Sequence, residues 1–245
     1  MPDQPSFSLH GKVAVVTGGA RGIGLATVRA LRNRGAAVAF TSTSQNGATQ
    51  AAADLRSETG PAVLGLEADV RAFDLVERAF AAVAEQLGGI DILVNNAGVG
   101  LFRPVADMTA DEWRLVVDTN LTGVFNGCRA ALPHLRRRGG GWVVNISSLA
   151  GSNPFSGGAA YCASKAAVNA FTEAFMQEVR QDGIRVSYVQ PGSVDTTFGG
   201  GGTGKSAWAL QPEDVAQVVC DLVAHPSRSL PSRVEIRPSQ PPKKG

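Results

Sequence analysis

Short apolar runs alternate with helix-compatible stretches along almost the whole of this 245-residue chain. The first run reads KVAVVT at 12–17 and the next reads AAVAFT at 36–41. Continuous apolar runs of this kind are typical of strands in a sheet that is covered on both faces. Strands that alternate with helices pair in parallel through right-handed crossovers. The pattern therefore predicts an α/β fold, with one doubly wound parallel sheet and helices on both faces.

The same pattern predicts where the individual elements lie. Strands are expected at 12–17, 36–41, 62–66, 90–94, 142–146, 184–189 and 234–236, and helices at 22–33, 48–57, 73–86, 111–137, 159–180 and 212–224. No linker or change of composition divides the chain, so we expect a single domain over residues 1–245. The Pro-rich, basic ending at 238–245 is expected to fray.

Composition disfavours several classes of protein. The 23 basic and 21 acidic residues leave a formal net charge of +2, which is too balanced to favour nucleic acid or an anionic membrane as a partner. Three histidines and three cysteines are scattered along the chain, so a metal site, a disulfide framework and a Ser-His-Asp triad are not expected. Residues 1–9 have no signal-peptide pattern, and no apolar run reaches transmembrane length. These features favour a cytoplasmic protein with reduced thiols.

A glycine-rich segment, TGGARGIG at 17–24, joins the first expected strand to the first expected helix. Gly18 permits a tight turn, Gly22 lets the backbone approach a pyrophosphate, and Gly24 lets the helix pack closely on the sheet. The helix N-terminus then offers free N–H groups and the positive end of its dipole to phosphate. The spacing differs from the common GxGxxG fingerprint, and a glycine-rich turn without a ligand is the alternative.

The end of the second expected strand bears on the choice between NAD and NADP. An Asp or Glu there accepts hydrogen bonds from the ribose 2′-hydroxyl of NAD and would repel a 2′-phosphate. The segment TSTSQ at 41–45 contains no acid, and the hydroxyls of Ser42 and Thr43 can donate to a phosphate. Arg21 in the glycine loop supplies a positive charge that suits phosphate oxygens. NADP(H) is therefore favoured over NAD(H), and a polar loop without contacts is the alternative.

Tyr161 and Lys165 lie four residues apart in YCASK, which places them one turn apart on the same face of the expected helix. A free tyrosine has a pKa of about 10 and is a poor acid or base at neutral pH. A neighbouring ammonium group favours the phenolate, so we expect Lys165 to lower the pKa of Tyr161 toward the working range. The alternative is an ordinary pair on a solvated helix face.

Ser148 closely follows the expected strand at 142–146, at the edge of the sheet where open α/β sheets bind ligands. Its hydroxyl can hydrogen-bond both a substrate carbonyl and the oxygen of Tyr161. A cap of a helix or turn is the alternative, because serine often has that role.

Two further polar segments complete the candidate site. NNAG at 95–98 follows the expected strand at 90–94; its asparagines can tie neighbouring strands together, while Ala97 and Gly98 leave room for a flat ring. Asn120 lies inside the long expected helix, where asparagine is unfavourable by propensity. It is therefore either exposed and idle, or it holds a water through its amide.

Taken in order along the chain, these motifs resemble the short-chain dehydrogenase/reductase family. The resemblance covers about 12–196 and rests on TGGARGIG, Asp69-Val70, NNAG, Asn120, Ser148, YCASK and PGSVDT at 191–196. Tyr161 lies thirteen positions after Ser148, a spacing that also matches the family. The resemblance implies a Rossmann-like sheet of about seven strands and a catalytic set of Asn120, Ser148, Tyr161 and Lys165.

The resemblance also implies the roles of these residues. Tyr161 is the general acid in reduction and the base in oxidation, and Ser148 polarises the carbonyl. Lys165 lowers the pKa of Tyr161 and binds the nicotinamide ribose, and Asn120 holds a water that links Lys165 to solvent. The implied cofactor-binding residues are Gly18, Ala20, Arg21, Gly22, Ile23, Gly24, Ser42, Thr43, Asp69, Val70, Asn96, Ala97, Gly98, Tyr161, Lys165, Pro191, Gly192, Val194 and Thr196.

The implied function is that of an NADPH-dependent carbonyl reductase, or secondary alcohol dehydrogenase, acting on a small molecule. The pattern is similar to that of NADP-dependent 3-oxoacyl carrier-protein reductases, and it implies a homotetramer, or a dimer. One alternative is an NAD-dependent alcohol, sugar or steroid dehydrogenase. The other is a non-catalytic dinucleotide-binding regulator, which the complete catalytic set disfavours because a sensor does not need all four residues.

The region after the motif at 191–196 is the least patterned. GGGGTGKS at 199–206 formally matches a P-loop, but it lacks the strand–loop–helix context that a phosphate cradle needs. The resemblance makes 193–211 a substrate lid, and its glycines predict that it is mobile. EIRP at 235–238 departs from the glycine-rich ending of many family reductases, so acyl-substrate specificity does not simply carry over.

Overall fold

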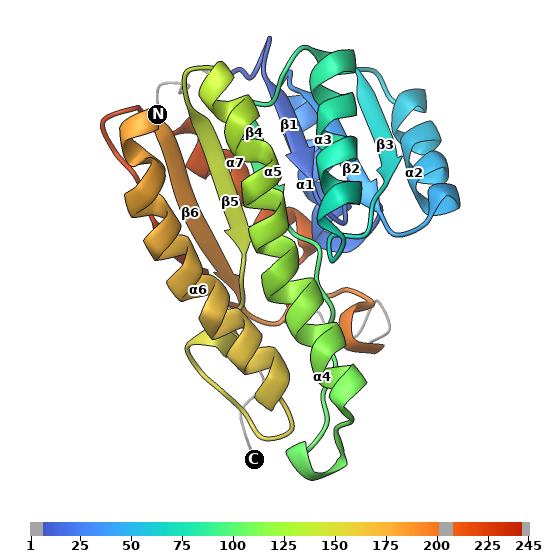
Figure 1. The fold of residues 1–245 in the computed structure, drawn as a ribbon, viewed down its shortest axis with the longest axis vertical. Helices are drawn as coiled ribbons and strands as arrows, with labels where there is room; N and C mark the ends of the chain where they lie inside the picture. The colour runs from blue at the N-terminus through green and yellow to red at the C-terminus, as the bar shows by residue number, and fades with distance from the viewer. Residues whose placement is uncertain (1–6, 201–207, 242–245) are drawn as a thin grey trace.

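Seven strands form one parallel sheet in the computed structural model, which describes residues 7–200 and 208–241 (Figure 1). Their order is β3-β2-β1-β4-β5-β6-β7, and every neighbouring pair is parallel. The strands are β1 (Val13–Val16), β2 (Ala37–Ser42), β3 (Val63–Glu67), β4 (Ile92–Asn95), β5 (Gly141–Ile146), β6 (Ile184–Pro191) and β7 (Arg233–Ile236). The predicted single-domain α/β fold with a Rossmann-like sheet is confirmed.

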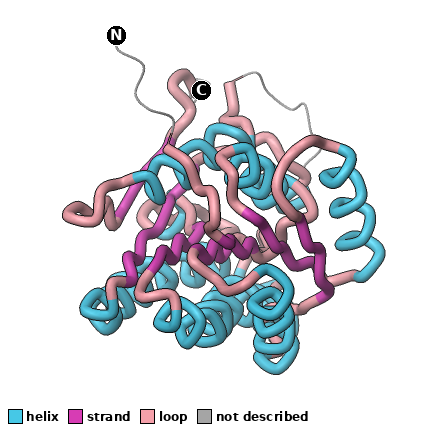
Figure 2. Tube along the Cα trace, turned by 90° about the horizontal axis from the view of Figure 1, so that it is seen from above, coloured by secondary structure: helices cyan, strands magenta, loops and turns pink. Residues whose placement is uncertain are grey.

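The helices cover both faces of the sheet (Figure 2). They are α1 (Gly22–Asn33), α2 (Gln45–Ser57), α3 (Phe73–Leu87), α4 (Ala110–Val117), α5 (Gly123–Arg137), α6 (Ala159–Val179) and α7 (Pro212–Ala224). Helices α1, α2 and α7 share one buried core with the sheet, and α3, α5 and α6 share the other. Leu31 and Val219 are fully buried in the first core, and Phe80 and Val168 in the second.

The stretch 111–137, predicted as one long helix, is interrupted in the structure. A π-helical turn over Asp118–Thr122 separates α4 from α5. Such turns insert an extra residue into a helix and are frequent at functional sites. Asn120 lies in this turn, and its side chain bonds both the N–H and the C=O of Val99. The partner is distant in sequence, so helical periodicity alone could not have indicated the interruption.

The other boundaries lie close to the predicted ones, and α1 and α7 begin and end at the predicted residues. Two predictions fall partly outside the described residues. The substrate lid at 193–211 includes residues 201–207, and the fraying tail at 238–245 includes residues 242–245. Both stay predictions.

Parallel pairing brings the carboxyl ends of all the strands to one edge of the sheet. The strand order reverses direction between β1 and β4, which are neighbours in the sheet although two strands separate them in sequence. Open α/β sheets bind ligands at such a switch point, outside the carboxyl ends of the strands. Helix α4 projects beyond this edge (Figure 1).

Asp91 lies just before β4, at the opposite edge of the sheet, and its side chain is only 5% exposed. Its carboxylate accepts hydrogen bonds from Lys12 Nζ at 3.1 Å, from Arg138 Nε at 3.1 Å and from the Val13 N–H at 3.0 Å. Burial acts to raise the pKa of this carboxyl, but the three hydrogen bonds outweigh it, so the pKa lies below its ordinary value. Asp91 thus ties the start of β1 to β4 and to the end of α5.

We expect Asp91→Ala to lower the free energy of unfolding by about 2 kcal/mol, because it leaves two cations and a buried N–H without their partner. Urea denaturation at pH 7 and fixed protein concentration measures the change. Asp111→Asn is the matched control. Asp111 is also paired with an arginine, but its side chain is 91% exposed, so its substitution should leave the midpoint unchanged.

The contribution of Asp91 to the free energy of unfolding should fall as the pH is lowered. Because its folded-state pKa is lowered, the stabilisation is present above the unfolded-state pKa of about 3.9 and is lost as the pH falls through the folded-state value. The gap in stability between wild type and Asp91→Asn should therefore be widest near pH 7 and should close below about pH 4. A gap that stays constant from pH 7 to pH 3 would contradict this role.

Candidate active site

A cleft of about 1420 Å³ runs along the carboxyl edge of the sheet. This volume exceeds the range of about 300–1,000 Å³ that is usual for a small-molecule pocket, so the cleft has room for an extended ligand and a second molecule. Among its lining residues are the predicted Gly18, Ala20, Arg21, Gly22, Ile23, Ser42, Thr43, Asp69, Val70, Asn96, Ala97, Gly98, Ser148, Tyr161, Lys165, Pro191, Gly192, Val194 and Thr196. The remaining two predicted residues, Gly24 and Asn120, support this lining from behind.

The glycine loop after β1 has the geometry predicted for it. Gly18 has a φ of +65°, and a Cβ there would lie 2.9 Å from the Cα of Ala97, so only glycine fits. A Cβ at Gly24 would lie 2.3 Å from the carbonyl oxygen of Gly18, which explains how closely α1 packs on the loop. The N-cap of α1, Arg21, makes no side-chain capping bond. The first N–H groups of α1 are therefore available to an anion in the cleft.

Arg21, Ser42 and Thr43 come together at the β1–β2 part of the cleft. Arg21 is exposed, and its Nη1 donates to the hydroxyl of Thr197 at 3.0 Å, on the segment that follows β6. The structure therefore brings the predicted arginine and hydroxyls into one cleft, while directing the guanidinium to a residue that the sequence did not single out.

Asp69 and Val70 follow β3 and line the same half of the cleft. Asp69 pairs with Arg71 at 2.6 Å, and the hydrogen bond from this guanidinium holds the pKa of the carboxyl below its ordinary value. The carbonyl of Val70 accepts from Asn126 Nδ2 at 2.8 Å, which fixes this segment to α5.

A ladder of buried amides lies behind the centre of the cleft. The strand register places Asn95 of β4 beside Asn145 of β5, and Asn95 Nδ2 donates to Asn145 Oδ1 at 2.9 Å. Asn145 Nδ2 then donates to Thr172 Oγ1 of α6 at 2.8 Å. Asn96 donates to two carbonyls of the glycine loop at 3.0 and 3.1 Å. The prediction that these asparagines tie strands together is confirmed, and the ladder also anchors α6.

Tyr161 lies near the start of α6 and is 8% exposed. Burial raises the pKa of its phenol above the ordinary value, and the nearby Ser148 hydroxyl partly opposes this effect. Ser148 Oγ accepts from the Ala150 N–H at 3.1 Å, so it caps the turn after β5 and also lies close to Tyr161. The two alternatives for Ser148 are therefore not exclusive.

Lys165 lies one turn beyond Tyr161 and is 4% exposed. Its Nζ donates to the carbonyl of Ile146 at 2.8 Å and lies 5.9 Å from the centroid of the Tyr161 ring. Burial lowers the pKa of Lys165 to about 8. In this structure the pKa of Tyr161 is raised and not lowered, because burial of the phenol dominates. The expected effect of Lys165 on this pKa stays a prediction.

Asn120 is fully buried and is not idle. Its Oδ1 accepts from the Val99 N–H at 2.8 Å, and its Nδ2 donates to the Val99 carbonyl at 3.0 Å and to Ser164 Oγ at 3.1 Å. A Cβ at Gly98 would lie 3.2 Å from Asn120 Oδ1 and 3.8 Å from Lys165 Nζ. The π turn thus brings Asn120 into contact with Ser164, the neighbour of Lys165 in sequence. The predicted role of Asn120 in holding a water stays a prediction.

Two buried polar residues that support the site were missed in the sequence. Gln190 Nε2 donates to the carbonyl of Ser148 at 3.1 Å and to Ser152 Oγ at 2.8 Å. Thr17 Oγ1 accepts two successive N–H groups after β4 at 3.0 and 3.1 Å. Thr17 and Gln190 both stand at the carboxyl end of a buried strand. A polar residue at the end of an apolar run is the sequence signal that would have indicated these two, because a buried polar group needs a hydrogen-bond partner.

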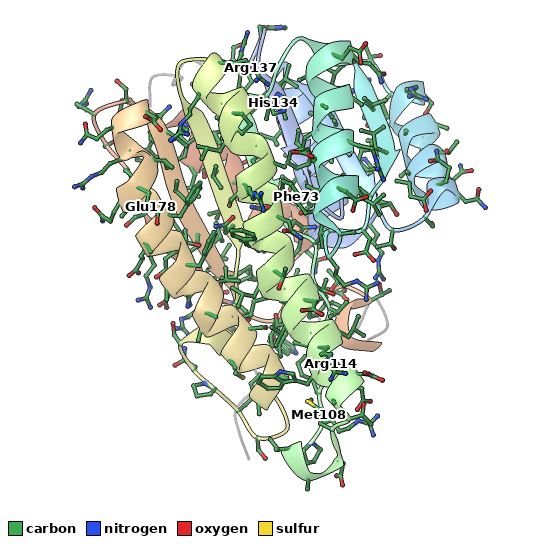
Figure 3. The ribbon with its side chains drawn as sticks, in the orientation of Figure 1. Phe73, Met108, Arg114, His134, Arg137 and Glu178 are labelled. Atoms are coloured by element: carbon green, nitrogen blue, oxygen red, sulfur yellow. The ribbon has the colours of Figure 1, made fainter. Side chains whose placement is uncertain are left out.

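Histidines and clusters of metal-ligating side chains are absent from the cleft in the described part of the chain. Its cleft-lining residues include no histidine, and no group of three or more metal-ligating side chains occurs in it. His134 contacts Arg137 at 2.7 Å near the end of α5, and Figure 3 places both far from Arg114 and Met108 at the α4 end. All three cysteines are buried and free. Across residues 7–200 and 208–241, the helices are too short or too polar to span a membrane.

Known proteins resemble this chain over most of its length. Residues 12–202 match the family model for short chain dehydrogenases. A 3-oxoacyl-[acyl-carrier-protein] reductase of Vibrio cholerae is 38% identical over 190 residues, which cover 78% of this chain and 76% of that protein.

Solved structures agree with this match. An alcohol dehydrogenase from the archaeon Thermococcus sibiricus, complexed with 5-hydroxy-NADP, has a TM-score of 0.88 and 33% identity, covering 95% of this chain and 99% of that one. A metagenomic short-chain oxidoreductase in complex with NADP has a TM-score of 0.83 and 35% identity. The match covers 96% of this chain and 100% of that one. With its sheet order and glycine loop, the chain belongs to the short-chain dehydrogenase family and is an NAD(P)-dependent oxidoreductase.

Proposed function

We propose that this protein is an NADPH-dependent carbonyl reductase that also works in reverse as a secondary alcohol dehydrogenase. One observation carries the proposal: Ser148, the buried Tyr161 and, one turn away, the buried Lys165 line the same cleft as the glycine loop, with Ser148 close enough to act on the pKa of Tyr161. The substrate is a small ketone or secondary alcohol. The hydride comes from the nicotinamide dinucleotide and is the cofactor's own chemistry.

In reduction, the Tyr161 hydroxyl donates its proton to the carbonyl oxygen of the substrate, and Ser148 holds that oxygen by a hydrogen bond. The raised pKa of Tyr161 keeps the phenol protonated at neutral pH, which suits a general acid. In oxidation the same oxygen must accept a proton, so the deprotonated phenol is the active form. This direction is favoured as the pH rises.

Lys165 and Asn120 prepare this proton transfer. The ammonium of Lys165 lies 5.9 Å from the Tyr161 ring and stabilises negative charge that develops on the phenol. It also contributes donors to the nicotinamide ribose. Asn120 holds Ser164, the neighbour of Lys165, and the backbone at Val99 in place, and it holds the water that links Lys165 to solvent.

The chain's residues fit a dinucleotide. The uncapped N-terminus of α1 offers its N–H groups to a pyrophosphate, and the positive φ of Gly18 shapes the loop in front of it, where a side chain would clash with Ala97. We assign the adenine to the surface at Asp69 and Val70. The remaining contacts are those predicted, with Gly18, Ala20, Arg21, Gly22, Ile23, Gly24, Ser42, Thr43, Asn96, Ala97, Gly98, Tyr161, Lys165, Pro191, Gly192, Val194 and Thr196.

NADP(H) is preferred because the end of β2 carries hydroxyls and no acid, with Arg21 in the same cleft. Two neighbours of similar fold contain NADP or 5-hydroxy-NADP, which supports the same choice. We further propose that the protein is cytoplasmic and assembles as a homotetramer, with a dimer as the alternative.

Tyr161→Phe should lower kcat for NADPH-dependent ketone reduction by about 10²- to 10⁴-fold, because it removes the proton donor. Stopped assays of NADPH oxidation measure kcat, and equilibrium titration should show NADPH affinity changed by less than about threefold. Tyr188→Phe is the matched control. Tyr188 is the other tyrosine of the chain, and its hydroxyl bonds to Glu173 at 2.9 Å, away from the cleft lining. Retained turnover in Tyr161→Phe would rule out Tyr161 as the acid.

The pH profile of reduction should follow Lys165. Its pKa of about 8 lies below the raised pKa of Tyr161, so raising the pH first removes the charge of the ammonium. We expect kcat/KM for ketone reduction to be flat near pH 7 and to decline above about pH 8. In Lys165→Arg, the residual activity should decline only at a higher pH, because arginine keeps its charge. A wild-type profile that is flat to pH 10 would exclude this role.

Cofactor preference is tested with Arg21. NADPH should bind more tightly than NADH, and Arg21→Gln should weaken NADPH binding by about tenfold through the loss of a charge-assisted hydrogen bond, without weakening NADH. Arg78→Gln on α3, an exposed arginine that is also ion-paired, is the control. Ser42→Asp should shift the preference toward NADH. Tighter wild-type binding of NADH would make the protein an NAD-dependent dehydrogenase instead.

A further inference from the structure

Two phenylalanines contact Tyr161, and a third packs against one of them. Phe102 makes an edge contact with the Tyr161 ring, with ring centroids 5.4 Å apart and planes at 83°. Phe198 lies 5.8 Å from Tyr161, and Phe155 lies 5.6 Å from Phe102, both tilted. We name Phe102, Phe155 and Phe198 the aromatic wall.

The aromatic wall is assembled from three loops that follow β4, β5 and β6. Glycines provide the space for its rings: a Cβ at Gly100 would lie 2.4 Å from Phe198 Cε1, and one at Gly158 would lie 2.5 Å from Phe155 Cε2. Backbone this close restricts where a ring can move. The wall therefore has a defined position relative to Tyr161, although its members are distant in sequence.

The wall presents unusual apolar surface to the cleft. Phe102, Phe155 and Phe198 all line the cleft and remain 48%, 48% and 40% exposed. Large apolar side chains left exposed in a concave site mark a place where an apolar ligand binds. Binding of such a ligand would remove the apolar surface of the ligand and that of the wall from water.

Charged side chains lie mainly elsewhere in the cleft. On the β4–β6 half, within the described residues, the charged lining group is Lys165, whose ammonium donates to the Ile146 carbonyl. The other charged lining residues belong to the β1–β3 half or follow β7; they are Arg21, Arg29, Asp54, Asp69, Arg71 and Arg237. A substrate group that lies on the wall therefore meets rings rather than charges.

We propose that the aromatic wall selects substrates that carry an aromatic ring beside the reacting carbon, namely aryl ketones and the corresponding benzylic alcohols. This inference rests on the proposed reductase function and names its substrate class. Phe102 touches the Tyr161 ring, so a carbonyl held at the Tyr161 and Ser148 hydroxyls places its substituent next to the wall. Tilted and edge contacts between rings favour an aromatic group over a saturated one of equal size by about 2- to 12-fold per pair.

Acetophenone and cyclohexyl methyl ketone test this selection, because they share a carbon skeleton and only the first is aromatic. We expect the ratio of their kcat/KM values, acetophenone over cyclohexyl methyl ketone, to fall about fivefold in Phe102→Leu and in Phe155→Leu. Leucine keeps an apolar side chain and removes only the ring. Phe125→Leu is the matched control: Phe125 is 43% exposed, but it contacts Phe171 on the α5–α6 surface, so the ratio should not change.

Binding is measured separately from turnover, so that failure of the reductase function can be distinguished from failure of this inference. Calorimetric titration of the dinucleotide-loaded protein should give acetophenone an affinity at least about fivefold above that of cyclohexyl methyl ketone, and the Leu variants should lose this preference. Unchanged urea midpoints show that the variants fold. Equal binding of the two ketones, or a preference that survives both substitutions, overturns the inference. Selective binding without turnover of any ketone supports the wall and refutes the proposed reductase.

Discussion

Parallel pairing of β1, β4, β5 and β6 is the constraint on which the site depends. Because the four strands run in the same direction, the segments that follow them open onto one edge of the sheet. The glycine loop, the Asn96–Gly98 segment, Ser148 and the loop that starts at Pro191 therefore share a single cleft. The buried bond between Asn95 and Asn145 holds the middle pair of these strands in register, so a slip of one residue would break it.

Burial shapes the chemistry of Tyr161 and Lys165, the proposed proton-transfer group. It raises the pKa of Tyr161 and lowers that of Lys165, because in each case low polarity disfavours the charged form. The pair is thus poised with a protonated phenol beside an ammonium that titrates at about pH 8. Such opposed shifts are a common sign of acid–base function, and they support the proposed carbonyl reduction more than alcohol oxidation near neutral pH.

Much of this architecture was predictable from the sequence. Apolar runs of five or six residues between glycines and helix-compatible stretches indicated six of the seven strands, since strands covered on both faces read in this way. The seventh was expected at the shorter segment 234–236. The motifs also placed Ser148 and Tyr161 in one site, and in the structure both line the same cleft. The interruption at Asp118–Thr122 and the contact from Arg21 to Thr197 were not predictable, because each depends on a partner that is far away along the chain.

The sequence by itself determined the fold class, the glycine loop and the residue types available for proton transfer, because these follow from local periodicity and short motifs. Only the tertiary structure decided how those residues are poised. It buried Lys165 against Ile146, it buried the phenol of Tyr161, which raises its pKa, and it brought Gln190 beneath Ser148. It also brought two phenylalanines against Tyr161 and a third against one of them, from three different loops. Burial and long-range contacts set pKa values and the shape of the cleft, and neither is encoded at any single position.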